Sequence, residues 1–517
     1  MSGYLDHLPA VLRSKDLADL LDVFEKTLSG IDDGVATPGA PLAPLIEALP
    51  DLYDPARTRP EFLPWLAGWL GFELPPGWTV AQRRRVVAGV MGLHLRRGTH
   101  QGLAELLDLA VPVAGRQRVT VDAGAKVLFA RPAPGAPARV HTLLSQGPYL
   151  RPDRTLAHSG LVSPQCLATT PAGDLLVGDA GGIGRSPAPG LWRVTRTGAY
   201  ADHTGAPPAP RPLGSAAWNL TTPVAVAVEA TPAGWAAYVL DVQQTGLRLS
   251  RLTSAAPFQE ETLALHASVQ TVVDIPAAVV HQGKLLILNR KDRRVVEVDP
   301  AAPSAPPRTI ALPGLTSPRS MTVAPDGRLV VGDARPDTPA ELFLVDAAGA
   351  TAPMPLLAAV AGNPLLAPYA VLHEDSHVLL VLDVGLQPDQ DPARPYLRRT
   401  LRPALLYRVD LRTDPPRVTP ASEPGGLVFP RGMVRHEGVL YLCDGGEPLS
   451  RNETGPNGTP RRNLRASANE LAVIVHFARA GATEADQRVA LRSVGDALDR
   501  ERPASVLPTL LSAIGTD

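Results

Sequence analysis

The sequence PEFLPWLAGWLGFELPPGWTVAQRRRVVAGVMGLHLRRGTHQGLAELLDL, residues 60–109, predicts three consecutive amphipathic helices. In the first, Trp65 and Trp69 lie four residues apart and therefore share one helix face. Thr79, with a glutamine three residues later, has the pattern of a capping box and predicts the start of the second helix. Such short helices are stable only when they bury their apolar faces against one another. We therefore expect residues 1–112 to form a helical domain.

The order of short motifs in this stretch resembles the phage tail protein I family, whose members belong to the baseplate wedges of contractile tails and tail-like injection systems. The motifs that carry the resemblance are Asp54-Pro55, Phe62 to Ala67, Trp69 to Gly71, Trp78, Arg84-Arg85, Arg97 to Thr99 and Gly102-Leu103. YLDHLPAVLR (4–13) and LLDVFEKTL (20–28) also resemble the start of that family. The resemblance covers about the first 110 residues. It implies a structural subunit, in six copies per particle, that docks to other wedge proteins, the spike or hub, and sheath-initiating proteins.

Six residues of the helical domain are candidates for this docking. They are Trp65, Trp69, Trp78, Arg84, Arg85 and Arg97. Arginine forks are preferred where an interface binds carboxylates of a neighbouring subunit. The alternative for the arginines is a solvated face balanced by nearby acidic residues, and the sequence leaves both interpretations open.

A second helical face lies upstream, where Leu17, Leu20, Leu21, Phe24 and Leu28 recur at helical spacing. Helical stripes usually face their own domain, so we expect this one to pack in the core. Packing on the helices of a partner chain is the alternative.

Composition excludes several classes of protein. The chain has 517 residues, enough for two or three domains, and a net charge of −1, which gives no overall attraction to nucleic acid or an acidic membrane. Cys166 and Cys443 are too few for a disulfide framework, and two buried thiols are the favoured interpretation. The sequence has no signal-peptide pattern and no apolar run of about 18 residues. We therefore expect cytoplasmic assembly into a phage-tail-like particle.

Between residues 153 and 480 a pattern recurs six times: a proline, an apolar strand, a turn, a second strand ending in Asp or Asn, and further strands. The prolines are Pro164, Pro223, Pro276, Pro318, Pro368 and Pro430, and the matching residues are Asp179, Asp241, Asn289, Asp333, Asp383 and Asp444. Six small antiparallel sheets that must stack on one another predict a six-bladed β-propeller. The units SPRSMTVAPDGRLVVGDA and SPQCLATTPAGDLLVGDA resemble NHL-type or gluconolactonase-like blades in fold.

The six acids and amides at the strand ends have two interpretations. They can ring a central channel and hold a cation. Alternatively, each accepts backbone N–H groups and shapes the following turn, which we favour because the same residue class recurs in every unit. We therefore expect no metal and no cofactor.

The fold class predicted is multidomain, α plus all-β: a helical domain, a propeller and a short helical tail. Residues 113–152 are assigned to a short β segment, with a hairpin in QRVTVDAGAKVLFA, and a proline-rich linker. RTLAHSG (154–160) is predicted to complete the sixth blade beside ELAVIVHF (470–477). Residues 481–517 are predicted to contain two helices separated at Pro503.

Catalytic motifs are absent from the sequence: it has no HExxH, no GxSxG, no phosphate-binding loop and no paired CxxC. We expect a structural, non-enzymatic baseplate subunit whose propeller is an accessory interaction domain. The alternatives are a lactonase- or hydrolase-type propeller enzyme with an N-terminal docking domain, and a propeller that binds a target surface.

Overall fold

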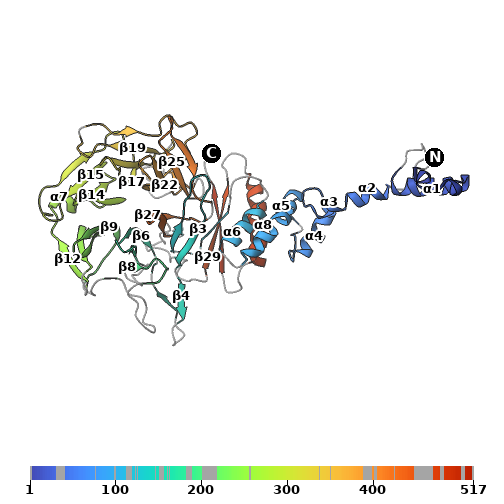
Figure 1. The fold of residues 1–517 in the computed structure, drawn as a ribbon. Coiled ribbons are helices and arrows are strands. Elements are labelled where there is room, and N and C mark those ends of the chain that lie inside the picture. The colour runs from blue at the N-terminus through green and yellow to red at the C-terminus, as the bar shows by residue number, and fades with distance from the viewer. Residues whose placement is uncertain are drawn as a thin grey trace. The chain divides into compact units, whose positions relative to one another are not determined.

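A computed structural model describes residues 3–514 apart from 31–40, 76, 98–99, 112–118, 123, 125, 146, 151–155, 160, 162, 182–188, 201–212, 214–217, 255–257, 337, 350, 388–398, 401–403, 424–425, 447–469, 478–482 and 502–506. The chain divides into two compact units, Met1–Ala114 and Gly115–Asp517. The first is helical and the second contains a six-bladed β-propeller (Figure 1), as predicted.

The helical unit is built from short elements. They are η1 (Gly3–His7), η2 (Ala10–Leu12), α1 (Lys15–Leu28), α2 (Leu42–Glu47), α3 (Leu49–Tyr53), η3 (Pro60–Phe62), α4 (Leu63–Trp69), α5 (Val80–Leu95) and α6 (His100–Ala110). The predicted capping box is present: the Thr79 side chain accepts from the backbone N–H of Gln82, whose Oε1 accepts from that of Thr79. Gln82 also donates from Nε2 to the carbonyl oxygen of Ala110 (2.7 Å), which fixes the start of α5 to the end of α6.

The core of this unit lies where α4, α5 and α6 meet. Its fully or nearly fully buried side chains include Leu63, Leu66, Ala67, Trp78, Val86, Val87, Val90, Leu106 and Leu107. The expectation of core packing is wrong for α1, in which Ala18 alone is buried, while Leu20 and Phe24 are each 52% exposed. The elements that pack most closely on α1 are η1 and α2. Both are short, so they leave most of its apolar face uncovered.

The propeller consists of six sheets, each named by its strands from the axis outward. Blade 1 is β6 (Pro164–Thr169), β7 (Leu175–Asp179) and β8 (Gly190–Val194); blade 2 is β9 (Pro223–Thr231), β10 (Gly234–Gln243), β11 (Gly246–Thr253) and β12 (Gln259–Leu263). Blade 3 is β13 (Ala277–His281), β14 (Lys284–Asn289), β15 (Arg294–Val298) and β16 (Arg308–Ala311); blade 4 is β17 (Pro318–Val323), β18 (Leu329–Asp333), β19 (Glu341–Val345) and β20 (Met354–Pro355). Blade 5 is β21 (Pro368–His373), β22 (Val378–Asp383), β25 (Leu405–Asp410) and β26 (Arg417–Pro420); a two-stranded insertion, β23 (Leu386–Gln387) and β24 (Arg399–Thr400), lies between β22 and β25.

Strands from both ends of the repeat close the ring in blade 6, as predicted, but they are not the strands that the sequence analysis assigned to it. It consists of β27 (Pro430–His436), β28 (Val439–Asp444), β2 (Lys126–Ala130) and β3 (Val140–Ser145). Residues 126–145, which the sequence assigned to a β segment and linker, are therefore two strands of a blade. β2 fits there because all its side chains except that of Phe129 are buried, as an interior strand requires.

Two further sequence predictions are wrong for the same region. RTLAHSG contributes β5 (Leu156–Ser159), which pairs with β4 (Gly147–Leu150) and not with the sixth blade. β1 (Val119–Asp122) forms no hairpin with β2; it pairs antiparallel with β29 (Glu470–Phe477). β1 thereby joins a three-stranded sheet, which an isolated hairpin does not provide, whereas β4 and β5 form a two-stranded sheet of their own.

The chain after the ring adds a small α/β sheet, ordered β1-β29-β30, with α8 (Glu484–Glu501) connecting β29 to β30 (Leu507–Ile514). The C-terminal helix is as predicted, but the second helix is wrong, since β30 pairs with β29 in parallel. An eight-residue apolar run fits a helix or a strand equally well in sequence, and the open edge of β29 decides for the strand. Pro508 is tolerated because β30 lies at the edge of the sheet.

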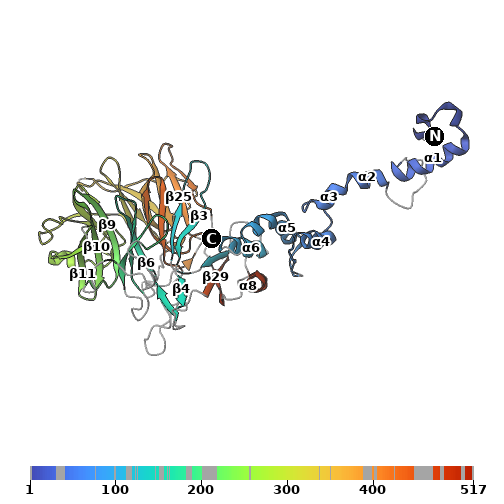
Figure 2. The same ribbon diagram turned by 60° about the horizontal axis from the view of Figure 1, so that its bottom comes forward.

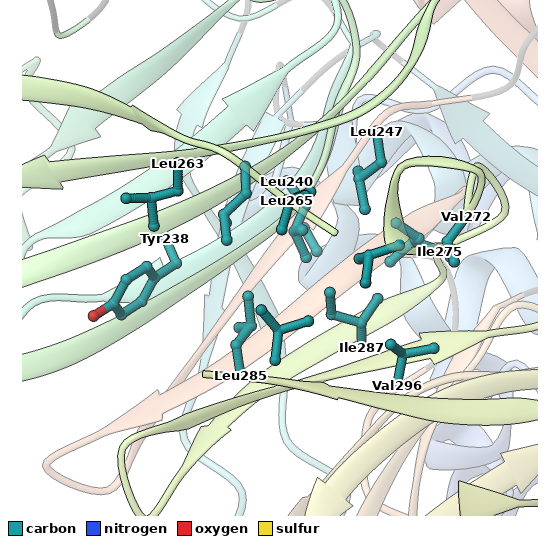
Figure 3. Close-up of a cluster of buried hydrophobic side chains, with 14 of the residues drawn as sticks. Tyr238, Leu240, Leu247, Leu263, Leu265, Val272, Ile275, Leu285, Ile287 and Val296 are labelled. Carbon is teal, nitrogen blue, oxygen red and sulfur yellow. The ribbon is translucent and has the colours of Figure 1, made fainter. Parts of the chain in front are cut away.

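The blades stand side by side around the ring (Figures 1 and 2). Apolar side chains pack between the faces of neighbouring blades. Between blades 2 and 3, Leu240 and Leu263 face Leu285 and Ile287 across the interface (Figure 3). The inner strands also contact one another around a closed ring, in the order β6, β9, β13, β17, β21, β27 and back to β6. Because no blade covers both of its own faces, the ring is stable only when complete.

Candidate functional site

An exposed aromatic cluster lies on the helical unit, formed by Tyr53, Phe62, Trp65 and Trp69. The two indole rings lie 4.5 Å apart between centroids, and Tyr53 lies 6.2 Å from each of them. Phe62 meets Trp65 edge to face at 6.2 Å. Trp65 is 42% and Trp69 67% exposed, so this cluster presents large aromatic surface to solvent.

The position of the cluster follows from α4 having two apolar faces. Leu63, Leu66 and Ala67 point into the core, while Trp65 and Trp69, four residues apart, share the opposite side. Pro60 begins η3, where its missing N–H costs no helical hydrogen bond. A helix that is apolar on both faces needs a second partner besides its own core.

Exposed apolar side chains continue over α1, α2 and α3. The large ones at least 37% exposed are Leu20, Val23, Phe24, Leu28, Leu42, Leu45, Ile46, Leu49 and Tyr53. Soluble proteins rarely expose so many neighbouring apolar residues unless they bind something there. We name these residues, together with Phe62, Trp65 and Trp69, the helical apolar surface.

Trp78 does not belong to this surface. It is 4% exposed and lies near the Phe72 ring, with centroids 6.3 Å apart. Trp78 directly precedes the N-cap of α5 and is a core residue of the helical unit.

Arg84 has a structural contact of its own. It donates from Nη1 to the carbonyl oxygens of Pro55 (2.6 Å) and Ala56 (2.5 Å), and from Nη2 to that of Thr58 (2.8 Å). These bonds tie the loop after α3 to α5. Arg84, which the sequence analysis proposed as a docking residue, therefore stabilises the packing of this loop on α5 within the helical unit.

The other two candidate arginines differ in burial. Arg85 is partly buried, and its Nε has no hydrogen-bond partner among the described residues. Arg97 is exposed just after α5. Beside it, Arg96 forms an ion pair with Glu105 of α6. The structure thus does not gather the three nominated arginines into one exposed patch.

The strand-end acids of the propeller bind backbone N–H groups. In blade 5, Asp383 accepts from Leu366 (2.6 Å) and Ala367 (3.0 Å), the two residues before Pro368, and from Gly385 (2.7 Å). Pro368 lies opposite Asp383 in the strand pairing, and a bulge follows. Since proline has no N–H to donate to the ladder, the carboxylate organises the chain at the point where the inner strand begins.

The same arrangement recurs in four other blades. Asp179, Asp241, Asp333 and Asp444 are buried, and each accepts from one or both of the residues preceding its blade's proline. Blade 3 is the exception. There the side-chain oxygen of Asn289 accepts from the backbone N–H of Asp292 (3.1 Å). The residues before the blade's proline are held by a different contact, in which Arg290 Nε donates to the carboxylate of Asp274 (2.9 Å).

Ionisation of the buried groups follows their surroundings. Burial raises the pKa of Asp333, although N–H groups of Thr316 and Ser317 and the nearby Arg335 oppose the shift. Burial also raises the pKa of both thiols, that of Cys443 to about 12, so neither is a reactive thiolate at neutral pH. In the described part of the chain, no three His, Cys, Asp or Glu residues form a group able to hold a metal ion.

A second cluster, which sequence reasoning missed, joins blades 4, 5 and 6. Arg319 lies over the ring of Tyr369, which meets Phe429 edge to face, and Arg431 lies over Phe429. Arg319, Tyr369 and the pair Phe429 and Arg431 come from three separate parts of the sequence, but Arg319, Tyr369 and Arg431 each directly follow a blade proline. Aligning the repeats on those prolines would have placed three of them at one level.

Comparison with known proteins gives one family match. Residues 23–118 match the model of a family described as phage tail protein (Tail_P2_I), so the resemblance found in the sequence is confirmed. None of the curated proteins compared with the chain matches it. None of the helices in the described residues has the length and apolar character needed to cross a lipid bilayer.

Solved structures similar to the chain include a gluconolactonase from Xanthomonas campestris, with 12% identity over 61% of this chain and 97% of that one (TM-score 0.36). A glucose dehydrogenase-type putative oxidoreductase from a Thermus species has 14% identity over 58% and 95% (TM-score 0.35). A nidogen/laminin complex has 16% identity over 56% and 90% (TM-score 0.33). At these scores the likenesses carry no inference about activity.

Proposed function

We propose that this protein is a structural baseplate component of a contractile, phage-tail-like particle, and that its helical unit docks to neighbouring subunits through the helical apolar surface. The family match of residues 23–118 supports a structural role in a phage tail. The observation that carries the docking proposal is the exposure of Trp65 and Trp69 beside a well-packed core.

The energetics favour docking through these side chains. Burying one large apolar side chain contributes about 1.5–3 kcal/mol, and aromatic anchors dominate most interfaces. Trp69, 67% exposed, has most of that contribution still to gain. Exposed leucines and Phe24 on α1 extend the same surface, so a partner that presents apolar helices fits it.

The partners proposed are other wedge proteins, the spike or hub and sheath-initiating proteins, with six copies of this chain per particle. No nucleic-acid binding and no membrane insertion are proposed. The propeller is proposed as an accessory interaction domain without enzymatic activity.

The test is co-expression of the full chain with the baseplate proteins encoded beside it. The variant Trp65→Ser/Trp69→Ser is expected to fold, as judged by circular dichroism, but to lose co-purification with those proteins. The matched control is Val273→Ser, an exposed apolar position in the propeller, which is expected to retain it. Undiminished co-purification of the double variant contradicts docking through this surface.

The non-enzymatic part of the proposal has its own test. Purified full chain is assayed for bound metal by mass spectrometry and for hydrolysis of a simple lactone. We expect no stoichiometric metal and no turnover above the rate without protein. Metal-dependent turnover that Asp333→Asn abolishes would overturn this part and leave the docking proposal untouched.

A further inference from the structure

Acidic side chains are concentrated on α1, α2 and α3 of the helical unit. These helices contain six acidic residues and two lysines, a net charge of −4, so the remainder of a chain with net charge −1 carries +3. The acidic residues are Asp16, Asp19, Asp22, Glu25, Glu47 and Asp51. The part of the helical apolar surface that lies on these helices is therefore surrounded by negative charge.

Two of the carboxylates, those of Asp19 and Glu47, have no compensating charge within the described part of the chain. Both side chains are exposed, and neither forms an ion pair with any described residue. Asp51 differs from them, because it is paired with Arg57 (3.0 Å). A partner is therefore needed to supply the positive charge that faces Asp19 and Glu47.

The stability of the helices does not explain these two residues. Aspartate is a poor helix former, and Asp19 lies beyond the first turn of α1, where a negative charge would favour the helix. Glu47 is the last residue of α2, where the helix dipole disfavours a negative charge. Residues that cost local stability indicate a role outside their own helix.

The apolar side chains beside these carboxylates follow the line of a helix. Leu20, Val23, Phe24 and Leu28 form a stripe along α1, with exposed fractions between 37% and 62%. A stripe with this spacing accepts the apolar ridge of a second helix packed along it. Ile46 of α2, 62% exposed, adds apolar surface next to Glu47.

We propose that α1 and α2 bind an amphipathic helix of a partner protein whose apolar stripe is flanked by lysines or arginines. The proposal rests on the docking function proposed above and adds the sign of the partner's charge. A second copy of this chain docking through the same face would bring like charges together, and an acidic lipid surface would be repelled in the same way. A basic helix covers the exposed leucines and places its cations beside Asp19 and Glu47.

The test uses two synthetic amphipathic helices of about five turns with the same leucine face, one with a lysine and the other with a glutamate polar face. Binding of each peptide to the full chain is measured by fluorescence anisotropy. At low salt we expect the lysine peptide to bind at least about tenfold more tightly than the glutamate peptide. In 1 M NaCl the screening length falls to about 3 Å, and the difference should largely disappear.

The variant Asp19→Lys/Glu47→Lys is expected to lose the preference for the lysine peptide. Lysine is a better helix former than aspartate and is favoured at the end of a helix, so this variant should fold at least as well as wild type. The matched control, Glu261→Lys/Asp496→Lys, makes the same change in net charge at exposed positions of β12 and α8. It is expected to keep the preference.

Three results overturn the proposal: no binding of the lysine peptide to wild type, equal affinities of the two peptides at low salt, or the same loss of preference in both double variants. The docking function is judged separately, by co-purification of Trp65→Ser/Trp69→Ser. Loss of co-purification in that variant, together with no peptide preference in wild type, removes the basic helix and leaves docking intact. Undiminished co-purification with a clear peptide preference retains the basic helix and removes the aromatic cluster from the interface.

Discussion

Replacing Asp383 by alanine is expected to destabilise the propeller more than a typical point mutation does. The carboxylate is 1% exposed and accepts three backbone N–H groups, from Leu366, Ala367 and Gly385. Each buried donor left without an acceptor costs about 1–3 kcal/mol. Water entering the space left by the side chain offsets part of this cost, so we expect a loss of about 3–5 kcal/mol in the free energy of unfolding.

Asn289→Ala in blade 3 is the matched comparison, because its side chain accepts one described backbone N–H, that of Asp292. By the same reasoning it is expected to cost about 1–2 kcal/mol. Urea unfolding of the full chain measures both values. Hydrogen exchange followed by mass spectrometry adds a local measurement, because the amides of Leu366, Ala367 and Gly385 should lose protection only in Asp383→Ala. Equal destabilisation by the two variants would refute the reasoning that these acids organise the strand starts.

Three other predictions follow from burial. Burial raises the pKa of Asp333 in the folded chain, so the folded state binds the proton of this carboxyl group more tightly than the unfolded state does. Wild type should therefore gain stability relative to Asp333→Asn as pH falls from 6 to 4, by about 1.4 kcal/mol per unit of pKa difference. A loss of relative stability over that range in urea unfolding contradicts this prediction. Trp78→Ala should cost about 3–5 kcal/mol, whereas Trp69→Ser should stay within about 1 kcal/mol of wild type, and similar unfolding midpoints for the two would place Trp78 outside the core. Cys166 and Cys443 should resist a thiol reagent at pH 8 in the native chain and react in urea; rapid labelling of native protein is the opposing result.

The repeat could be predicted because each unit is encoded within a contiguous stretch. A proline, an acid 13 to 18 residues later and the strands between them define one turn and one pairing register. The Thr79–Gln82 capping box is equally local, and it is present as predicted. Such signals depend on neighbouring residues and survive without knowledge of the rest of the fold.

The closing strands could not be found in the same way. Leu128 pairs with Leu442 in blade 6, and Val121 pairs with Val473 in the small sheet, so each partner lies at the far end of the chain. Several apolar segments compete for each position, including 154–160 and 488–494, and local pattern does not rank them. The first of these became β5 and the second part of α8.

Sequence alone determined the number of blades, the Asp or Asn near the end of each second strand and the apolar, helical character of the first unit, since all of these rest on spacing within a short segment. Tertiary structure decided which apolar residues are buried. Trp69 and Trp78 are indistinguishable as tryptophans, yet one faces solvent and the other the core, because burial depends on what the remaining elements place opposite each side chain. It likewise brought Arg319 and Arg431 to one cluster through Tyr369 and Phe429, because blades 4, 5 and 6 stack in succession.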